Sequence, residues 1–231
     1  MLVSHENKYI FIHIPKTGGT ALSESLIPFM QPSDICVPGD GERIHEYLHY
    51  HTPARYAIRA FAELGWNWNE YTSVVIIRNP FEILHSDYWF HRYIGETKWK
   101  NPPPEDLEDY EWQKKCYESQ YQTFTDYCTR VYGHWDRGFY HHYCCDDARE
   151  NQIVSRVFLY DNTLHDIWWH AKAKFGLPIE LEIEKINATN QVCGKERPKI
   201  QDDYTPKLIE LVNDVFRYDL ARFGFTLENA Q

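Results

Sequence analysis

A long apolar run is missing from this sequence, and no export signal is expected. The chain of 231 residues contains six cysteines, whose irregular spacing predicts free thiols rather than a disulfide framework. No apolar run reaches the roughly 20 residues that a membrane-spanning helix needs. Residues 1–8 precede the first strand-like segment and are too few for a signal peptide. We therefore expect a soluble, cytoplasmic protein without a membrane segment.

Positive charge is also in short supply. Lys and Arg number 24 against 34 Asp and Glu, so the net charge at pH 7 is −10. This balance argues against nucleic acids and highly sulfated glycans as partners, because both are polyanions. A local basic pocket can still hold one anionic cofactor. The charge balance therefore favours a small substrate.

Two common nucleotide-binding motifs are absent. The sequence contains no G-x-x-x-x-G-K-[ST], which disfavours a simple NTPase, and no G-x-G-x-x-G, so dinucleotide binding has no support. It also shows no internal repeat. Hydrophobic residues make up 43% of the chain and aromatic residues 16%, which is enough for a sizeable core. We expect a single domain over residues 1–231.

The segment around which the chain is organised joins an apolar run to a glycine-bearing turn. Residues 9–14 are β-branched and aromatic, which predicts a buried strand. Pro15 ends the strand, and Gly18 and Gly19 permit a tight turn into a helix. The first N–H groups of such a helix bind phosphate or sulfate, and Lys16 adds a mobile positive charge. The alternative is that the two glycines only permit the turn.

Two further strand-to-helix units follow the same plan. Residues 72–77 predict a buried strand, followed by Arg78 and a helix over residues 81–93. Ser86 lies about two turns into that helix, so the guanidinium and the hydroxyl can face one phosphate. Taken singly, either residue also fits an ordinary surface position. With a third strand at residues 154–160, the pattern predicts an α/β fold with a central parallel sheet flanked by helices.

Capping residues mark the remaining helices. Thr52 is the expected cap of a helix that begins at the following proline, while Thr205 and Gly224 bound the last helix. Residues 98–109 are rich in proline and acidic residues and predict an exposed loop, and residues 132–150 give no clear assignment. In addition to the helix over residues 81–93, the sequence predicts helices over residues 19–29, 54–64, 111–131, 163–175 and 205–223.

Together, the two anion-binding segments resemble the paired signature of sulfotransferases that use 3′-phosphoadenosine 5′-phosphosulfate (PAPS). Pro15–Thr20 is similar to their 5′-phosphosulfate loop, and Val75–Pro80 with Ser86–Tyr88 is similar to their 3′-phosphate site. The branch that the chain resembles is that of the membrane-anchored carbohydrate sulfotransferases and their soluble bacterial relatives. His85 stands where relatives often carry a basic residue. Residues 98–150 match poorly and are expected to form an acceptor-side insertion.

The resemblance implies a P-loop-kinase-like sulfotransferase architecture and a set of site residues. The 5′ side of the donor is expected at residues 16–21, the 3′-phosphate at Arg78 and Ser86, and a closing loop around Asn187. The product is 3′-phosphoadenosine 5′-phosphate, and no metal is expected. The implied cofactor-binding residues are Lys16, Thr17, Gly18, Gly19, Thr20, Ala21, Arg78, Ser86 and Asn187.

Transfer to a hydroxyl requires a general base with a pKa near neutrality, which favours histidine. The resemblance implies a histidine between the two cofactor motifs, and His51 is the first choice. His49, His45 and His13 are the other candidates. His51 otherwise reads as an ordinary capping or surface histidine. Lys16 is expected to stabilise the charge on the departing phosphate.

Two other functions compete with sulfuryl transfer. A nucleotide-dependent small-molecule kinase would need Mg²⁺ and carboxylates near the phosphates, for which Asp87 is the nearest candidate. A non-catalytic nucleotide-binding module would lack a positioned base. Residues 141–147 contain metal-ligating residue types, but adjacent ligands disfavour a zinc site. The acidic balance favours a small hydroxylated acceptor, either a neutral or cationic specialised metabolite or a sugar.

Overall fold

The computed structural model describes residues 1–36, 45–98, 110–161, 163–183 and 198–230. The chain divides into two compact units. The first unit joins Met1–Arg78 to Phe139–Ile186, and the second joins Asn79–Gly138 to Asn187–Gln231. In the described ranges all strands belong to the first unit, whereas the second unit is built from helices.

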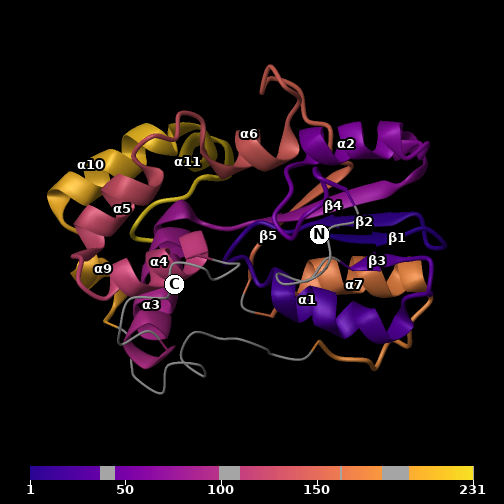
Figure 1. Cartoon of the computed structure of the whole chain (residues 1–231), viewed down its shortest axis with the longest axis horizontal. Coiled ribbons are helices and arrows are strands. Elements are labelled where there is room, and N and C mark those ends of the chain that lie inside the picture. Colours follow the sequence, from indigo (N-terminus) through magenta and orange to yellow (C-terminus); the bar gives the residue numbers. More distant parts are fainter. Residues whose placement is uncertain (37–44, 99–109, 162, 184–197, 231) are drawn as a thin grey trace. The chain divides into compact units, whose positions relative to one another are not determined.

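A five-stranded sheet forms the centre of the first unit (Figure 1). Its order is β3-β1-β2-β4-β5. The strands predicted from the sequence correspond to β2, β4 and β5, and these pair in parallel. The prediction of an α/β fold with a mostly parallel central sheet is therefore confirmed. The strands in the described ranges are β1 (Leu2–Ser4), β2 (Tyr9–Ile12), β3 (Ile35–Cys36), β4 (Thr72–Ile77) and β5 (Arg156–Leu159).

The sequence does not predict the two short strands β1 and β3. Strand β1 pairs antiparallel with both β2 and β3. With three and two residues respectively, these strands are too short to show the alternation that marks a strand in a sequence. Strand β1 is nevertheless buried along its length. It covers the edge of β2 that would otherwise carry unpaired backbone groups.

Helices α1 (Gly19–Leu26) and α7 (His165–Phe175) cover one face of this sheet (Figure 1). Alternate side chains of β2 and β4 point toward them, and the short helix η1 (Ile27–Phe29) continues α1. This packing fixes the position at which the first strand turns into the first helix. The hydrophobic core on this face of the sheet consists of the buried residues Leu2, Tyr9, Phe11, Ala21, Leu22, Leu26, Val74, Ile76, Leu164, Ile167, Trp168 and Ala171.

Helix α2 (Ala54–Glu63) lies on the opposite side of the sheet (Figure 1). The predicted start is correct within one residue, but the predicted cap is wrong, because Pro53 occupies the cap position. The hydroxyl of Thr52 instead accepts from the His49 backbone N–H at 2.7 Å and donates to the His49 carbonyl at 2.9 Å. Thr52 therefore closes the turn that carries His51. The unit also contains η2 (Trp68–Glu70) and most of α6 (Gly138–Cys144).

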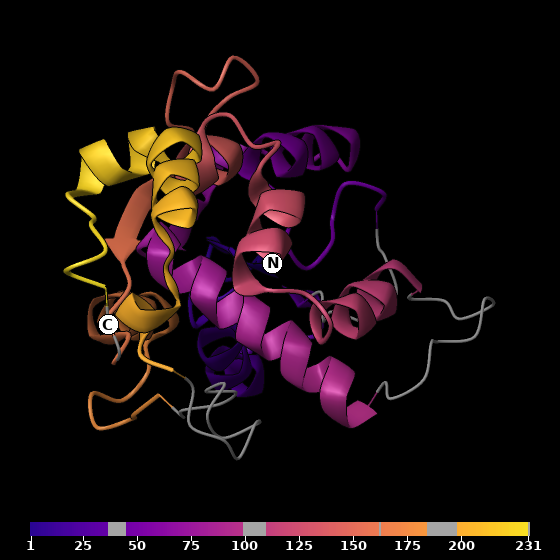
Figure 2. The ribbon, with the colours of Figure 1, turned by 90° about the vertical axis from the view of Figure 1, so that its left-hand side faces the viewer.

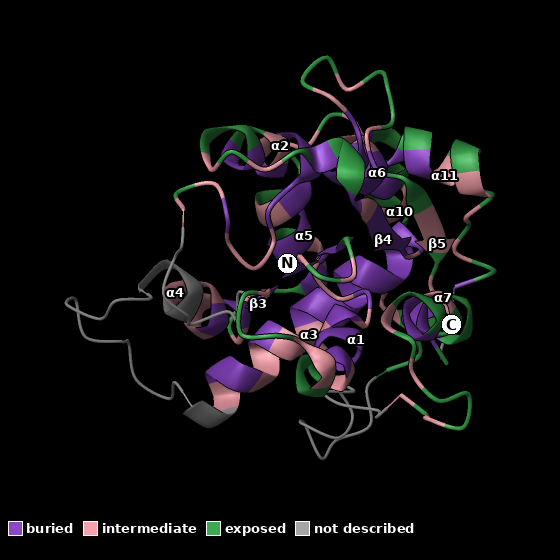
Figure 3. Ribbon diagram, turned by 90° about the vertical axis from the view of Figure 1, so that its right-hand side faces the viewer, coloured by how far each residue is buried: buried purple, intermediate pink, exposed green. Residues whose placement is uncertain are grey.

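The second unit is centred on the long helix α3, against which α4 and α5 pack (Figure 2). The side chain of Asn79 caps α3 by accepting from the Phe81 backbone N–H at 3.1 Å. Residues 79–88 are buried (Figure 3). Like the other helices in the described ranges, α3 does not combine the length and apolar character that a membrane crossing requires. The helices of this unit are α3 (Pro80–Lys98), α4 (Tyr110–Ser119), α5 (Phe124–Tyr132), α9 (Ile200–Asp203), α10 (Pro206–Val215) and α11 (Arg217–Phe223).

Two helices that the sequence predicts as continuous are each divided. Residues 111–131 contribute to α4 and α5, because Thr123 caps a new helix by accepting from the N–H three residues on. The last predicted helix forms α10 and α11, which meet at Phe216. Its outer limits are confirmed. Thr205 caps α10, and Gly224 ends α11 in a left-handed conformation.

Candidate active site

The segment between β2 and α1, residues 15–19, is here called the glycine loop. The hydroxyl of Thr17 is buried and donates to the Ile14 carbonyl at 2.9 Å. Gly18 has φ 77° and occupies the N-cap position of α1, a left-handed conformation that favours glycine. Lys16 also has a positive φ, 63°. The loop is thus a tight turn that leads directly into the helix.

The start of α1 can hold an anion. Its cap residue Gly18 has no side chain that could occupy the first N–H groups, and its first turn, residues 19–22, carries no carboxylate. Unpaired N–H groups and the positive end of the helix dipole favour a phosphate or sulfate here. Ala21 is buried in the core, so any contact it makes with a ligand would come from its backbone. The residues predicted for the 5′ side of the donor, Lys16 to Ala21, thus span the turn and the first residues of α1.

The backbone at Gly19 lies directly against the ring of His13. A Cβ atom at Gly19 would stand 2.2 Å from His13 Cδ2 and 2.5 Å from its Nε2, so no larger residue fits. The His13 ring is 3% exposed, and its Nδ1 has no hydrogen-bond partner among the described residues. Burial, followed by the influence of His51, holds the pKa of His13 well below its ordinary value. His13 is therefore a neutral ring wedged beneath the helix start.

His51 is partly buried beside His13, with 4.8 Å between the ring centroids. Its Nδ1 lies 2.9 Å from the His13 backbone carbonyl. Since a carbonyl can only accept, Nδ1 carries the proton, and in the neutral ring the lone pair is on Nε2. The neighbouring Tyr50 hydroxyl lies 2.9 Å from the Thr20 hydroxyl of α1. These two contacts join residues 45–52, here called the histidine segment, to His13, which precedes the glycine loop, and to the first turn of α1.

The two other histidines of this segment are held differently. His45 Nε2 pairs with Glu63 at 2.9 Å, and its Nδ1 accepts from the Tyr47 backbone N–H. His49 Nδ1 accepts from the His51 backbone N–H at 3.3 Å. In both rings a nitrogen serves the local turn. These bonds place the proton on Nε2 in His45 and His49 but on Nδ1 in His51. The role of His51 as the base stays a prediction.

Arg78 follows β4 and reaches the glycine loop. Its Nη1 donates to the Lys16 carbonyl at 2.9 Å, and its guanidinium carbon lies 4.1 Å from the ring centroid of Tyr160. The sequence interpretation missed Tyr160 as a site residue, although its place directly after the third parallel strand is a usable signal. Ser86 is buried on α3 of the second unit, at 5% exposure. The shared 3′-phosphate contact of Arg78 and Ser86 stays a prediction.

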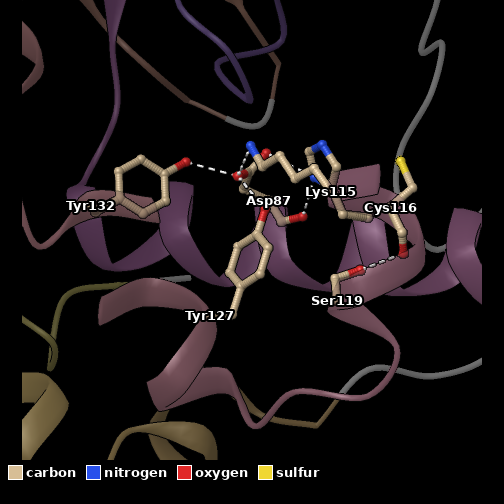
Figure 4. Close-up of polar contacts among 7 residues, drawn as sticks. Asp87, Lys115, Cys116, Ser119, Tyr127 and Tyr132 are labelled. Atoms are coloured by element: carbon tan, nitrogen blue, oxygen red, sulfur yellow. Dashed lines mark hydrogen bonds and ion pairs between the residues drawn. The ribbon is translucent and has the colours of Figure 1, made fainter. Parts of the chain in front are cut away.

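Asp87 is the centre of a buried polar cluster in the second unit (Figure 4), here called the Asp87 hub. Its carboxylate accepts from Tyr132 at 2.8 Å, from Tyr127 at 3.0 Å and from Lys115 at 3.2 Å, and His91 Nδ1 lies 3.2 Å away. Burial, with Asp87 next, raises the pKa of Tyr127 well above its ordinary value. The carboxylate named for the kinase alternative is therefore engaged in holding this unit together.

His85, the residue before Ser86, is paired within the second unit. Its Nε2 lies 2.9 Å from Asp203 Oδ2, which also accepts from the Trp89 indole N–H at 2.8 Å. The His85 side chain is 6% exposed. The buried His85 ring, held by the half-buried Asp203 carboxylate, is positioned by its own unit. Its place in the sequence therefore does not by itself make it a phosphate ligand.

The described residues contain no cluster of three or more His, Cys, Asp or Glu side chains that could hold a metal ion. In the segment 141–147, the His142 carbonyl accepts from Arg55, and Asp147 pairs with Arg59 at 2.7 Å. The cysteines in the described ranges are free thiols, as predicted. Asn187, the closing loop predicted around it and the acidic loop at 99–109 lie outside the described residues.

Comparison with known proteins places these features in one family. The family model described as Sulfotransferase family matches residues 1–226. The match includes the glycine loop, the histidine segment and the α3 segment. No protein of curated function and no solved structure matches the chain.

Proposed function

This chain belongs to the sulfotransferase family, and we propose that it transfers a sulfuryl group from PAPS to a hydroxyl of a small acceptor. Membership of the family makes it an enzyme of sulfuryl transfer. The donor, the catalytic base and the acceptor class are the parts that we propose. A cytoplasmic location stays a prediction from the sequence.

The observation that carries the proposal is the contact of His51 with His13, whose ring packs beneath the start of α1. The His13 carbonyl accepts a hydrogen bond from His51 Nδ1, and the His13 ring packs against Gly19 at the start of α1. His51, which carries the proposed basic nitrogen Nε2, therefore contacts His13, and His13 lies against the start of the helix where the anion is proposed to bind. Nearness of a base to a bound anion is what in-line transfer from a phosphosulfate requires.

In the proposed reaction, His51 Nε2 removes the proton of the acceptor hydroxyl as that oxygen bonds to sulfur. The bond between sulfur and the bridging oxygen of the 5′-phosphate breaks, and its electron pair leaves with 3′-phosphoadenosine 5′-phosphate. Lys16 and the first N–H groups of α1 stabilise the negative charge that develops on the 5′-phosphate. No redox change accompanies the transfer.

The residues present fit a doubly anionic donor. The glycine loop offers backbone N–H groups, the left-handed Gly18 and the charge of Lys16, which suits the 5′ side. The guanidinium of Arg78, whose Nη1 donates to the Lys16 carbonyl, is a planar fork of N–H donors of the kind that suits a phosphate. We assign Arg78 to the 3′-phosphate, together with Ser86 and with Asn187 of the predicted closing loop, on the strength of the sequence resemblance.

We propose a small hydroxylated acceptor, either a specialised metabolite or a sugar. The net charge of −10 supports this choice, because an acidic protein repels polyanionic acceptors such as nucleic acids. The matching acceptor contacts are expected in residues 98–150, the part that resembles the family least.

The proposal is tested by incubating the protein with PAPS and a panel of hydroxylated metabolites and sugars, with mass spectrometry to detect the added sulfuryl group. His51→Ala is expected to lower kcat about a hundredfold to ten-thousandfold. Its affinity for 3′-phosphoadenosine 5′-phosphate, measured by calorimetry, is expected to change less than about twofold, because the base contacts the acceptor rather than the nucleotide.

Three controls accompany this experiment. His165→Ala removes an exposed histidine and is expected to leave turnover unchanged, while His49→Ala tests the neighbouring ring. Titration with ATP and Mg²⁺ tests the kinase alternative. Retained turnover in His51→Ala would reject the base assignment, and binding of ATP but not of the bisphosphate would reject PAPS as donor.

A further inference from the structure

Arg78 makes two contacts in the first unit that a role as 3′-phosphate ligand does not require. Its Nη1 donates to the Lys16 carbonyl at 2.9 Å. Its guanidinium carbon lies 4.1 Å from the Tyr160 ring centroid, within the range of a cation–π contact. One side chain thus joins the end of β4, the glycine loop and the residue that follows β5.

The register of the parallel strands explains why these three residues meet. Ile12, the last residue of β2, pairs with Val75, so β4 continues two residues beyond β2. Arg78 consequently comes level with the loop that follows β2. On the other side Ile77 pairs with Leu159, and the Tyr160 backbone N–H donates to the Ile77 carbonyl at 2.7 Å. Tyr160 is therefore held beside Arg78 by the sheet itself.

The glycine loop has a backbone that needs such support. Lys16 has φ 63°, a conformation that residues with side chains rarely adopt and that persists only when surrounding contacts maintain it. The bond from Arg78 holds the carbonyl of this same residue. Tyr160 borders the next turn as well, because a Cβ atom at Gly18 would lie 3.2 Å from its Cε2. Both side chains therefore restrict the loop from the β4–β5 side.

We propose that Arg78 and Tyr160 form a brace that holds the glycine loop in its anion-binding conformation. Arg78 is then a positioning residue for the 5′ side of the donor, in addition to its predicted role at the 3′-phosphate. The inference rests on the proposed function. A lysine would keep the positive charge, but its compact ammonium does not provide a planar fork that donates to a carbonyl while stacking on a ring.

The test uses a nucleotide that lacks the 3′-phosphate. Calorimetry compares adenosine 5′-phosphosulfate with 3′-phosphoadenosine 5′-phosphate on the whole chain. Arg78→Lys and Tyr160→Leu are each expected to weaken the binding of adenosine 5′-phosphosulfate about tenfold, because the loop that receives its 5′ end loses support. Tyr160→Phe keeps the ring and is expected to stay within about twofold of the parent protein. Arg156→Lys, an exposed position on β5, is the matched control and should bind like the parent.

A double-mutant cycle separates a brace from two independent losses. If Arg78 and Tyr160 act together, combining Arg78→Lys with Tyr160→Leu weakens the binding of adenosine 5′-phosphosulfate scarcely more than either change alone. A double variant whose loss of affinity equals the product of the two single losses would overturn the proposal. Circular dichroism verifies that each variant is folded, and if Arg78→Lys is not, the contrast between Tyr160→Leu and Tyr160→Phe decides the question.

The two proposals fail in different ways. If the parent protein binds both nucleotides and Arg78→Lys weakens only the bisphosphate, Arg78 is a 3′-phosphate ligand alone and the brace is rejected. If the parent protein binds neither nucleotide, the proposed function fails and the brace fails with it. Weakened binding of both nucleotides by Arg78→Lys and by Tyr160→Leu supports the brace.

Discussion

The glycine loop of the first unit and the Asp87 hub of the second unit hold polar groups in opposite ways. Around the loop, side chains donate to backbone carbonyls: Arg78 to Lys16, Thr17 to Ile14 and His51 to His13. These bonds fix the course of the backbone. The N–H groups at the start of the next helix are thereby directed toward a common point, where we propose that the 5′ side of the donor binds.

In the Asp87 hub, by contrast, side chains satisfy one another. The carboxylate is 3% exposed and is surrounded by Lys115, His91 and two tyrosine hydroxyls. A carboxylate with so many donors has little capacity left for a ligand. The comparison teaches that a buried carboxylate beside a cofactor motif can serve the fold alone, whereas a site for an anion is made by holding carbonyls and presenting N–H groups.

The largest effect is expected from removing the hub. Asp87→Ala leaves the hydroxyls of Tyr127 and Tyr132 without their acceptor and Lys115 without its counter-ion, so we expect the free energy of unfolding to fall by about 4 kcal/mol. Urea unfolding measures this loss. Asp147→Ala removes a carboxylate from an exposed ion pair with Arg59 and should change stability little. Equal losses of unfolding free energy in the two variants would show that the Asp87 hub stabilises the protein no more than an exposed ion pair does.

A smaller loss of stability, but a specific loss of function, is expected at the loop. The Cβ atom of Gly19→Ala would overlap the buried His13 ring, so we expect a loss of about 3 kcal/mol together with weaker nucleotide binding. Gly65→Ala is the control, because its site is strained by a φ of 74° but open within 4 Å. It should lose about 1–2 kcal/mol and bind nucleotide normally. Normal binding by Gly19→Ala would contradict the close contact.

The smallest effect concerns pH. Because burial holds the pKa of His13 well below that of an exposed histidine, the unfolded chain takes up a proton near pH 6.5 that the folded chain does not. The contribution of the neutral His13 to the free energy of unfolding is therefore complete above that pH. It declines as the pH falls, by at most about 1.4 kcal/mol per pH unit. Urea unfolding between pH 7.5 and pH 5 is expected to show a shallower decline in His13→Gln.

Comparing the parent protein with His13→Gln isolates the contribution of His13 to the pH dependence of stability. His5 and His170 also have a pKa lowered by burial, but they are present in both proteins and their contributions cancel. His165→Gln changes an exposed ring and should follow the parent protein. An unchanged slope in His13→Gln would show that His13 does not titrate as its burial implies.

Much of the sheet could be predicted from the sequence, because buried parallel strands are continuous apolar runs. The predicted segments at 9–14, 72–77 and 154–160 correspond to β2, β4 and β5. The carboxyl ends of neighbouring parallel strands share one edge, so the nearness of Lys16 and Arg78 could be predicted as well. The divided helix at 111–131 had a readable signal in Thr123, a capping residue followed three positions later by an acid.

Other parts of the site depend on register and packing, which the sequence does not display. The contact of Arg78 with Tyr160 requires that β4 and β5 pair with Ile77 opposite Leu159. The fit of Gly19 against His13 requires a helix placed to within fractions of an ångström. The assignment of a proton to His51 Nδ1 depends on a carbonyl 38 positions away in the chain. Such contacts follow from the fold as a whole.

The positive φ of Lys16 has a consequence for how this protein can change. A residue that adopts the left-handed conformation more easily would relieve local strain, so Lys16→Gly is expected to gain about 1 kcal/mol of stability while removing the charge assigned to the leaving group. Under the proposed role of Lys16, selection for heat resistance alone would then favour less active variants at this position. The proposal thus sets stability against activity at the strained lysine.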